Sequence, residues 1–322
     1  MEWLIHSGIA ETRAVLVDRG AIIEAAVELD GSLRVGAVLA ARLTQILIPG
    51  RRGIAAFDGG EALLEPLPPR LTQGQAIRIE IVREAIPEAG RPKRPRARVT
   101  DAEPRDGPSL IERLRCSGTP AHAVAAEALD EAGWDELIEE ARSGDIPFPG
   151  GALRLSLTPA MTLFDVDGTL PLDALAIAGA TAAAGAIRRH GIGGSIGIDL
   201  PTARAKATRT AATDAIDAIL PQPFERTAVN GFGFVQIVRP RERLSLPELV
   251  QGDPAGAAAR ALLRHTEREG PGAIVITAAP AVLAQLRPDW IALLERRIGG
   301  RVALQPDPAL AISAGHVHRL QS

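Results

Sequence analysis

Three aspartates, Asp165, Asp167 and Asp199, stand at or just beyond the ends of two short apolar segments. The segments are residues 161–164 and 195–198, and runs of this kind are typical of strands that a sheet buries on both faces. Carboxylate oxygens are the ligands that Mg²⁺ and Mn²⁺ prefer in proteins, and no thiolate lies nearby in the sequence. Three carboxylates that converge could therefore hold one such ion, partly through water.

The segment between the two strands decides whether these acids can meet. Residues 171–190 are rich in small side chains and predict one helix, so the whole connection has the length of a βαβ crossover. A right-handed crossover makes the two strands parallel and brings their carboxyl ends to one edge, where open α/β sheets build their sites. The alternative is that these acids cap helices, for which Asp167 and Asp173 are suitable. We favour the metal site because Asp165 and Asp199 recur in matching contexts, and capping explains only one such position.

The composition limits the class of protein. A chain of 322 residues with 46% hydrophobic content has room for one large domain or for two or three small ones. The net charge of −3 predicts no general affinity for nucleic acid, so any such surface must come from local clusters. Cys116 is the single cysteine, which excludes an internal disulfide framework and a cysteine-based zinc site. We find no signal peptide and no apolar run long enough for a membrane span, and we expect a cytoplasmic protein.

The N-terminal third reads as strands. Residues 2–29 predict a hairpin around the turn Asp18-Arg19-Gly20, and residues 33–100 contain four or five short strands divided by Gly and Pro. This pattern favours a small barrel of the OB type, a fold that commonly holds single-stranded nucleic acid. Phe57 is the single aromatic residue of the barrel segment, and we expect it in the barrel core rather than in a base-stacking platform.

A basic arm, residues 90–99, follows the last clear strand of the barrel segment. Its two prolines disfavour helix, so it should be an extended loop or an edge strand. Two interpretations are equally supported: an arm that binds RNA phosphates in a salt-dependent way, or a solvated loop. Its basic residues are Arg91, Lys93, Arg94, Arg96 and Arg98.

The later segments alternate between helix and strand. Residues 105–148 predict a helical connector, interrupted at Gly133, with Trp134 and Leu137 packed inward. A helix beginning near Arg204 and Lys206 lies close to Asp199 in the sequence, where cations could neutralise a phosphodiester or form an exposed helix face.

A β-hairpin follows this helix, and a small α/β unit follows the hairpin. We expect Phe232 and Phe234 to pack the sheet, with Arg239 and Arg241 after the end of its strand. In the tail, His316 and His318 could ligate a metal, but an exposed pair at a strand end is favoured.

The chain resembles, from end to end, a short member of the ribonuclease E/G family, because five of that family's segments occur in order. They are similar to its opening strands, its RNA-binding barrel, the two strands that each carry a metal-binding Asp, and the segment after them. In this chain they read ETRAVLVDRGAIIEAAVE, then VGAVLAARLTQILIPGRRGIAAFDGG with GQAIRIEIVREA, then FPGGALRLSLTPAMTLFDVDG, GIGGSIGIDLP and GFGFVQIVRPRERLSL.

The resemblance implies an α/β fold with an RNase H-like and nuclease-like catalytic core, an inserted small OB-type β-barrel and a C-terminal small α/β domain. It implies a Mg²⁺-dependent endoribonuclease that cleaves single-stranded RNA. Asp165 and Asp199 would hold the metal, Asp167 stands where the family usually has Asn, and Phe57 stands at an RNA-contacting position. The implied domains are an N-terminal hairpin of the RNase H-like core (1–32), the barrel (33–104), a helical connector (105–148), the catalytic metal-binding core (149–250) and the C-terminal domain (251–322).

The chain also departs from the family. The zinc-linking cysteine motif expected after Leu246 is missing, so we expect no zinc, no zinc-linked oligomer, and a monomer or a homodimer. The region that senses an RNA 5′ end is largely gone, which leaves a non-catalytic RNA-binding member as an alternative. A second alternative is a haloacid dehalogenase-like phosphatase, because MTLFDVDGTL resembles its first motif, with Asp165 as nucleophile and Asp167 as acid. The later lysine and acidic pair of that family are not matched.

Overall fold

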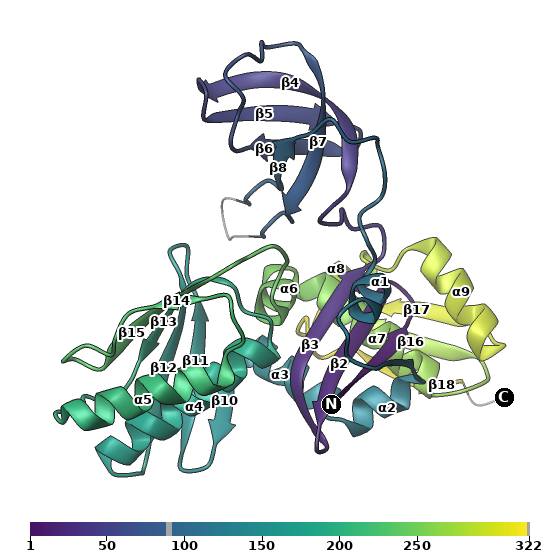
Figure 1. The fold of residues 1–322 in the computed structure, drawn as a ribbon. Helices are drawn as coiled ribbons and strands as arrows, with labels where there is room; N and C mark the ends of the chain where they lie inside the picture. Colours follow the sequence, from purple (N-terminus) through teal and green to yellow (C-terminus); the bar gives the residue numbers. More distant parts are fainter. Residues whose placement is uncertain (88–91, 321–322) are drawn as a thin grey trace.

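The computed structural model describes residues 1–87 and 92–320, and it has a mixed α/β architecture with a closed barrel and three sheets (Figure 1). The N-terminal sheet has the strand order β3-β2-β1-β9. Strands β1 (Glu2–Ser7), β2 (Glu11–Asp18) and β3 (Ala21–Leu29) run antiparallel, and β2 and β3 form the predicted hairpin. The barrel is inserted into the chain between β3 and the rest of this unit.

The connector after the barrel is less helical than the sequence predicts. It contains α1 (Leu110–Arg115), α2 (Ala126–Glu131) and α3 (Trp134–Ser143), but Ala121–Ala123 form β9, which adds to the N-terminal sheet parallel to β1. The prediction of helix at these three residues was wrong, because the open edge of β1 supplies backbone hydrogen-bond partners that a short segment can use. The predicted break at Gly133 is confirmed by its φ of 101°, and Trp134 and Leu137 are buried as expected.

The barrel consists of β4 (Val38–Ile48), β5 (Arg52–Phe57), β6 (Gly60–Leu64), β7 (Ala76–Arg83) and β8 (Arg96–Val99). Its closed strand order is β4-β5-β6-β8-β7, and β6 and β8 are its parallel neighbours. Leu43, Leu64, Ile79 and Ile81 fill its interior with no exposed surface. Figure 1 shows the barrel standing apart from the other sheets, above them in this view.

The central sheet positions the predicted site. It has the order β10-β11-β12-β13-β15-β14, built from β10 (Asp145–Phe148), β11 (Gly151–Leu157), β12 (Thr162–Gly168), β13 (Gly194–Asp199), β15 (Phe234–Arg239) and β14 (Glu225–Arg226). Only β12 and β13 are parallel to each other; the other neighbours are antiparallel. The crossover between them is α4 (Leu172–Arg189), and α5 (Lys206–Ile219) packs beside α4 on the same face of the sheet (Figure 1).

Small residues bring α4 close to this sheet. Gly179 lies so near β12 that a Cβ there would come within 2.4 Å of Val166 Cγ1. Because α4 and α5 cover one face only, Phe164 and Val166 of β12 are buried while Asp165 and Asp167 are exposed. The expectation of burial on both faces was therefore wrong for β12, since no helix of the described residues covers the second face of the sheet. It is confirmed for Ile196, Gly197 and Ile198 of β13, which are all buried.

The C-terminal part is the predicted small α/β unit. It contains α6 (Leu246–Gly252), α7 (Pro254–Arg268), β16 (Ile274–Ala278), α8 (Pro280–Leu283), α9 (Pro288–Ile298), β17 (Val302–Pro306) and β18 (His316–Arg319), with the strand order β17-β16-β18. The helix predicted over α8 and α9 is split before Pro288, which cannot continue a helix from the preceding residues. Within residues 1–87 and 92–320, no helix is long and apolar enough to cross a membrane.

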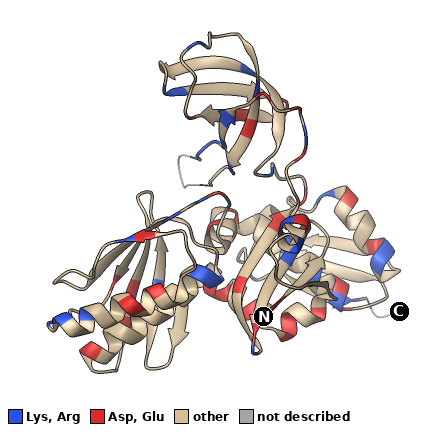
Figure 2. Cartoon of the chain, viewed as in Figure 1, with Lys and Arg blue, Asp and Glu red and all other residues tan. Residues whose placement is uncertain are grey.

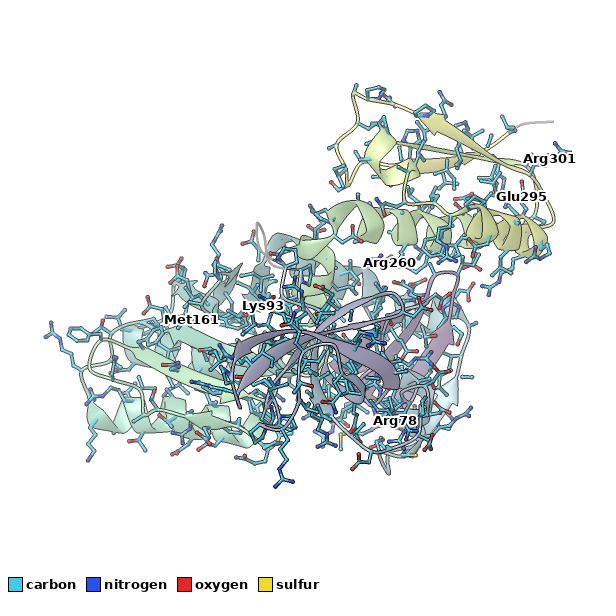
Figure 3. All side chains as sticks on the ribbon, turned by 90° about the horizontal axis from the view of Figure 1, so that it is seen from above. Arg78, Lys93, Met161, Arg260, Glu295 and Arg301 are labelled. Carbon is cyan, nitrogen blue, oxygen red and sulfur yellow. The ribbon has the colours of Figure 1, made fainter. Side chains whose placement is uncertain are left out.

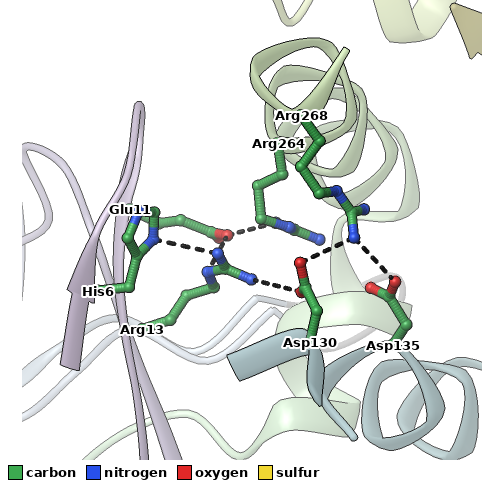
Figure 4. Close-up of polar contacts among 7 residues, drawn as sticks. All are labelled: His6, Glu11, Arg13, Asp130, Asp135, Arg264 and Arg268. Carbon is green, nitrogen blue, oxygen red and sulfur yellow. Dashed lines mark hydrogen bonds and ion pairs between the residues drawn. The ribbon is translucent and has the colours of Figure 1, made fainter. Parts of the chain in front are cut away.

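A buried ionic cluster joins the N-terminal sheet to α7 and α2 (Figure 4). Glu11 of β2, only 3% exposed, accepts from Arg264 and lies 3.3 Å from Arg260 Nε and 4.0 Å from Arg13 Nε. Arg13 is itself fully buried, and its guanidinium carbon lies 5.1 Å from the centre of the Trp134 ring. Burial, reinforced by Arg264, lowers the pKa of Arg13 to about 10. These contacts link segments more than 200 residues apart in sequence.

Candidate active site

Asp165 and Asp199 are direct neighbours across the parallel pair β12 and β13. Phe164 and Ile198, the residues just before them, point into the core with no exposed surface, which directs both carboxylates to the uncovered face. Neighbouring strands are about 4.8 Å apart, so two side chains in register on one face lie within reach of a single ion. The prediction of parallel strands is confirmed, and Asp199 ends β13 as expected. The prediction that Asp165 ends its strand was wrong, because β12 continues to Gly168 through its pairing with β11.

Asp167 lies on the same exposed face, two residues farther along β12, and pairs with Ala152 of β11. This displacement corresponds to about 7 Å along the strand. Within the part of the chain that the structure describes, no group of three or more His, Cys, Asp or Glu side chains is placed to hold a metal. The arrangement is therefore a carboxylate pair, Asp165 and Asp199, with Asp167 set apart from it.

The competing interpretation, that these acids cap helices, finds no support in the helix starts. The N-cap of α4 is Pro171 and that of α5 is Ala205, and neither start has a side-chain capping hydrogen bond. Asp173 lies in the first turn of α4, where a negative charge is favourable. Asp165, Asp167 and Asp199 thus have no structural role at these helix ends.

The two strands flanking the carboxylate pair differ in character. On one side Arg154 of β11 is in register with Asp165, but its guanidinium forms an exposed ion pair with Asp145, 3.3 Å away. On the other side Phe234 of β15 is in register with Asp199. A Cβ on Gly197 would come within 2.6 Å of Phe234 Cζ, so the phenyl ring lies directly over this glycine. The sequence did not indicate a role for Arg154 or Gly197, because only the order of the strands in the sheet places Arg154 beside Asp165 and Phe234 over Gly197.

The loop after Asp199 brings two cations to the same end of the sheet. Arg204 and Lys206, at the start of α5, are exposed, as one of the two sequence interpretations requires. Arg209 donates to the carbonyl oxygens of Ala203 at 2.9 Å and Arg204 at 2.8 Å, which fixes the loop. Both cations follow Asp199 within seven residues of the chain, on the segment that leaves the carboxyl end of β13.

Phe232 does not pack the sheet as predicted. Its side chain is 84% exposed, whereas Phe234 is half-buried. The reason is the tight turn before β15, in which Asn230 and Gly233 direct the backbone away from the core.

The basic arm is largely neutralised by the barrel itself. Three of its arginines lie near glutamates of other barrel segments, and Figure 2 shows basic and acidic residues interleaved in every part of the molecule. Arg91 lies outside the described residues, and Lys93 lines a cavity described below. The pairs are Arg94 with Glu61 at 2.9 Å, Arg96 with Glu65 at 3.9 Å and Arg98 with Glu80 at 2.8 Å.

Phe57 ends β5 and is half-buried against the barrel core, beside Gly60. This is the environment expected of a core residue that leaves one edge of its ring accessible.

Arg239 and Arg241 lie at the opposite end of the sheet from the carboxylate pair. β15 runs antiparallel to β13, so Arg239 is in register with Gly194 at the start of β13. Its Nη1 donates to Ile192 O at 3.0 Å, and burial lowers its pKa. Arg241 is bonded to Glu248. Neither arginine reaches Asp165 or Asp199.

A cavity of about 380 Å³ lies between residues 86–87 and 92–93, which follow β7, and the central sheet. It is lined on one side by Pro87 and Lys93 and on the other by Met161, Thr162 and Ser195 at the starts of β12 and β13; Figure 3 labels Lys93 and Met161. Thr162 precedes Asp165 by three residues, a distance of about 10 Å along the strand. The segment that follows β7 therefore lies beside the end of the sheet away from the carboxylate pair.

No protein-family model matches the chain, and a search of curated proteins finds no match. The resemblance to the ribonuclease E/G family stays a prediction.

Proposed function

We propose that this protein is a Mg²⁺-dependent endoribonuclease that cleaves single-stranded RNA. The observation that carries the proposal is the register of Asp165 with Asp199 on adjacent parallel strands, both exposed on the uncovered face of the sheet. Two exposed carboxylates at this spacing repel each other weakly in water, by about 1 kcal/mol at most, and a cation bound between them would turn that repulsion into attraction.

The residues suit the proposed metal. Mg²⁺ binds through one or two carboxylates and keeps several water molecules, and Mn²⁺ accepts the same donors. A metal held here would supply an activated water and would stabilise charge on the phosphate. Asp165 and Asp199 provide the hard oxygen ligands, and the described surroundings offer no sulfur donor that would favour zinc.

The other residues have distinct proposed roles. Asp167, on the same face and about 7 Å farther along β12, can accept a hydrogen bond from the attacking water and orient it. Arg204 and Lys206 can neutralise the phosphates of the bound strand. The proposed core would be of the nuclease type, joined to an RNase H-like N-terminal sheet.

The barrel supports RNA as the substrate class. Its strand order, with β6 parallel to β8 and β4 closing onto β7, agrees with an OB-type barrel, which commonly binds single strands. Phe57, Lys93, Arg94, Arg96 and Arg98 are its proposed contacts, with Arg91 outside the described residues.

A non-catalytic RNA-binding protein is the second candidate. It is favoured by one observation: the described residues form no three-ligand metal group, so the proposed ion would rest on two carboxylates. Such a protein would bind RNA without needing Asp165 or Asp199.

The test is cleavage of a 3′-labelled, A/U-rich single-stranded RNA by the full chain, with Mg²⁺ and with EDTA. Asp199→Asn and Asp167→Asn are compared with Asp145→Asn, a matched carboxylate on the same sheet that is bound by Arg154. Internal cuts that need Mg²⁺ and vanish in Asp199→Asn support the endoribonuclease. RNA binding without cleavage points to the second candidate. Hydrolysis of a phosphate monoester that needs Asp167 but not Asp199 would instead indicate a phosphatase.

A further inference from the structure

Phe232 has the highest exposure among the large apolar side chains of the described residues, at 84%. A single exposed apolar side chain is common and needs no explanation by itself. What distinguishes this one is the rigidity of the backbone beneath it and its position beside the carboxylate pair.

Hydrogen bonds on both sides hold the turn that carries Phe232. Asn230 Oδ1 accepts from the backbone N–H of Phe232 at 2.9 Å and from that of Phe234 at 3.1 Å. Thr202 Oγ1 donates to the carbonyl oxygen of Phe232 at 3.3 Å. Gly233 has a φ of +96°, and a Cβ there would come within 2.1 Å of Leu200 O. The turn is therefore packed directly on the segment that follows Asp199, and it presents the ring of Phe232 to solvent from a fixed base.

A second phenylalanine lies between Phe232 and the carboxylates in the order of the chain and the sheet. Phe234, two residues after Phe232, is in register with Asp199, and its ring lies over Gly197 beside Leu163. The two rings, here called the aromatic shelf, thus begin beside Asp199 and extend outward at the same end of the sheet. Arg204 follows Thr202 by two residues, so a cation lies on the segment that supports the shelf.

We infer that the aromatic shelf stacks on a nucleobase of single-stranded RNA, with Phe232 as the outer ring, and positions the adjacent phosphodiester beside Asp165 and Asp199. The inference rests on the proposed function and deepens it. Aromatic rings bind single strands in this way because every base has a π-face, and the contact tolerates different sequences. Phe232 is a positioning residue under this inference, since it touches a base and not the reacting atoms.

Binding in EDTA, with the RNA checked for integrity, tests the shelf independently of cleavage. The affinity of the full chain for a short single-stranded RNA is measured by fluorescence anisotropy for wild type, Phe232→Ala and Phe232→Trp. Leu304→Ala, at an exposed apolar residue of β17, is the matched control. We expect Phe232→Ala to weaken binding by about 5- to 100-fold, the effect of losing one base–aromatic stack, while Phe232→Trp and Leu304→Ala retain it.

Unchanged RNA affinity in Phe232→Ala overturns the inference. If that variant also sediments as a smaller species than wild type, the ring contacts a second copy of the chain instead. Because Phe232 is exposed, its substitution leaves the fold intact, and circular dichroism verifies this.

Failure of the shelf and failure of the nuclease give different results. Weakened binding in Phe232→Ala, with no Mg²⁺-dependent cleavage by wild type, supports the shelf and refutes the nuclease. Cleavage that depends on Asp199, with an unchanged KM in Phe232→Ala, refutes the shelf and supports the nuclease.

Discussion

Replacement of Glu11 by Gln tests how the buried ionic cluster holds the N-terminal sheet to α7. Among the described residues, Glu11 is the one carboxylate that pairs with both Arg260 and Arg264. Its side chain is only 4% exposed. The side chains of Arg13, Arg260 and Arg264 are 1%, 7% and 9% exposed. Gln keeps the shape of Glu and removes its charge, so three buried guanidinium groups lose their common counter-ion.

The expected loss in the free energy of unfolding is large. Removing one partner of a buried ion pair costs about 3–5 kcal/mol, because the remaining charge stays out of water. Burial, and after it the charge of Arg264, already lower the pKa of Arg13 to about 10, although Glu11 raises it. Removal of the Glu11 charge would therefore disfavour the charged form of Arg13 further. An effective dielectric constant near 20 gives roughly 5 kcal/mol for the attraction between Glu11 and Arg260 at their 3.3 Å separation, before desolvation is subtracted. We therefore expect Glu11→Gln to lose about 3–5 kcal/mol.

The assay is urea unfolding followed by tryptophan fluorescence, since Trp134 lies against Arg13 and reports on the cluster. Asp145→Asn is the control, because its pair with Arg154 is 58% and 69% exposed and should contribute less than about 1 kcal/mol. If Glu11→Gln loses no more stability than this control, the buried carboxylate does not hold the cluster together and the reasoning is wrong.

Three further predictions follow from single residues. Gly197→Ala should lose about 1–3 kcal/mol of stability, measured by urea unfolding, because its Cβ would lie 2.6 Å from Phe234 Cζ; a variant as stable as wild type would show that the ring is free to move. Burial lowers the pKa of His190 below 6.5, so the unfolded chain binds the proton at a higher pH than the folded chain does. The contribution of His190 to stability should therefore be constant above pH 6.5 and fall as the pH drops below 6.5. His190→Gln should reduce this dependence of the free energy of unfolding on pH, measured by denaturation at several pH values. Arg94→Ala should change RNA affinity less than Arg204→Ala in anisotropy titrations, because Glu61 already neutralises Arg94. A larger loss of affinity in Arg94→Ala would show that the basic arm binds RNA despite this ion pair.

The parallel pair of β12 and β13 could be predicted because two general rules apply to it. An apolar run that ends in an acid marks each strand, and a crossover of this length makes such strands parallel. The register of Asp165 with Asp199 follows from their similar positions after the two apolar runs, although β12 continues to Gly168. The barrel was predictable for a similar reason, since Gly and Pro divide its strands.

The uncovered face of the sheet could not be predicted in the same way. A run of four apolar residues is compatible with burial on one face or on both, and the number of helices that cover the sheet depends on the whole chain. The exposure of Phe232 had a local signal, the sequence Asn230-Gly231 before it, which is typical of a tight turn. The pairing of Arg94 and Arg98 had none, because Glu61 and Glu80 are distant in sequence and meet them only when the barrel closes.

The two ends of β12 and β13 give the proposed RNA path a direction. The cavity beside the segment after β7 lies at the starts of these strands, near Thr162 and Ser195, while Asp165 and Asp199 are the last residues of their parallel pairing. An RNA strand bound by the barrel would have to run along the uncovered face for about 10 Å to reach the carboxylate pair. Between them the ring of Phe234 and the side chain of Leu163 cover Gly197, so an RNA chain would run over this apolar surface. Under the proposed function, the missing second helical layer is therefore what makes the carboxylates accessible to a polymer.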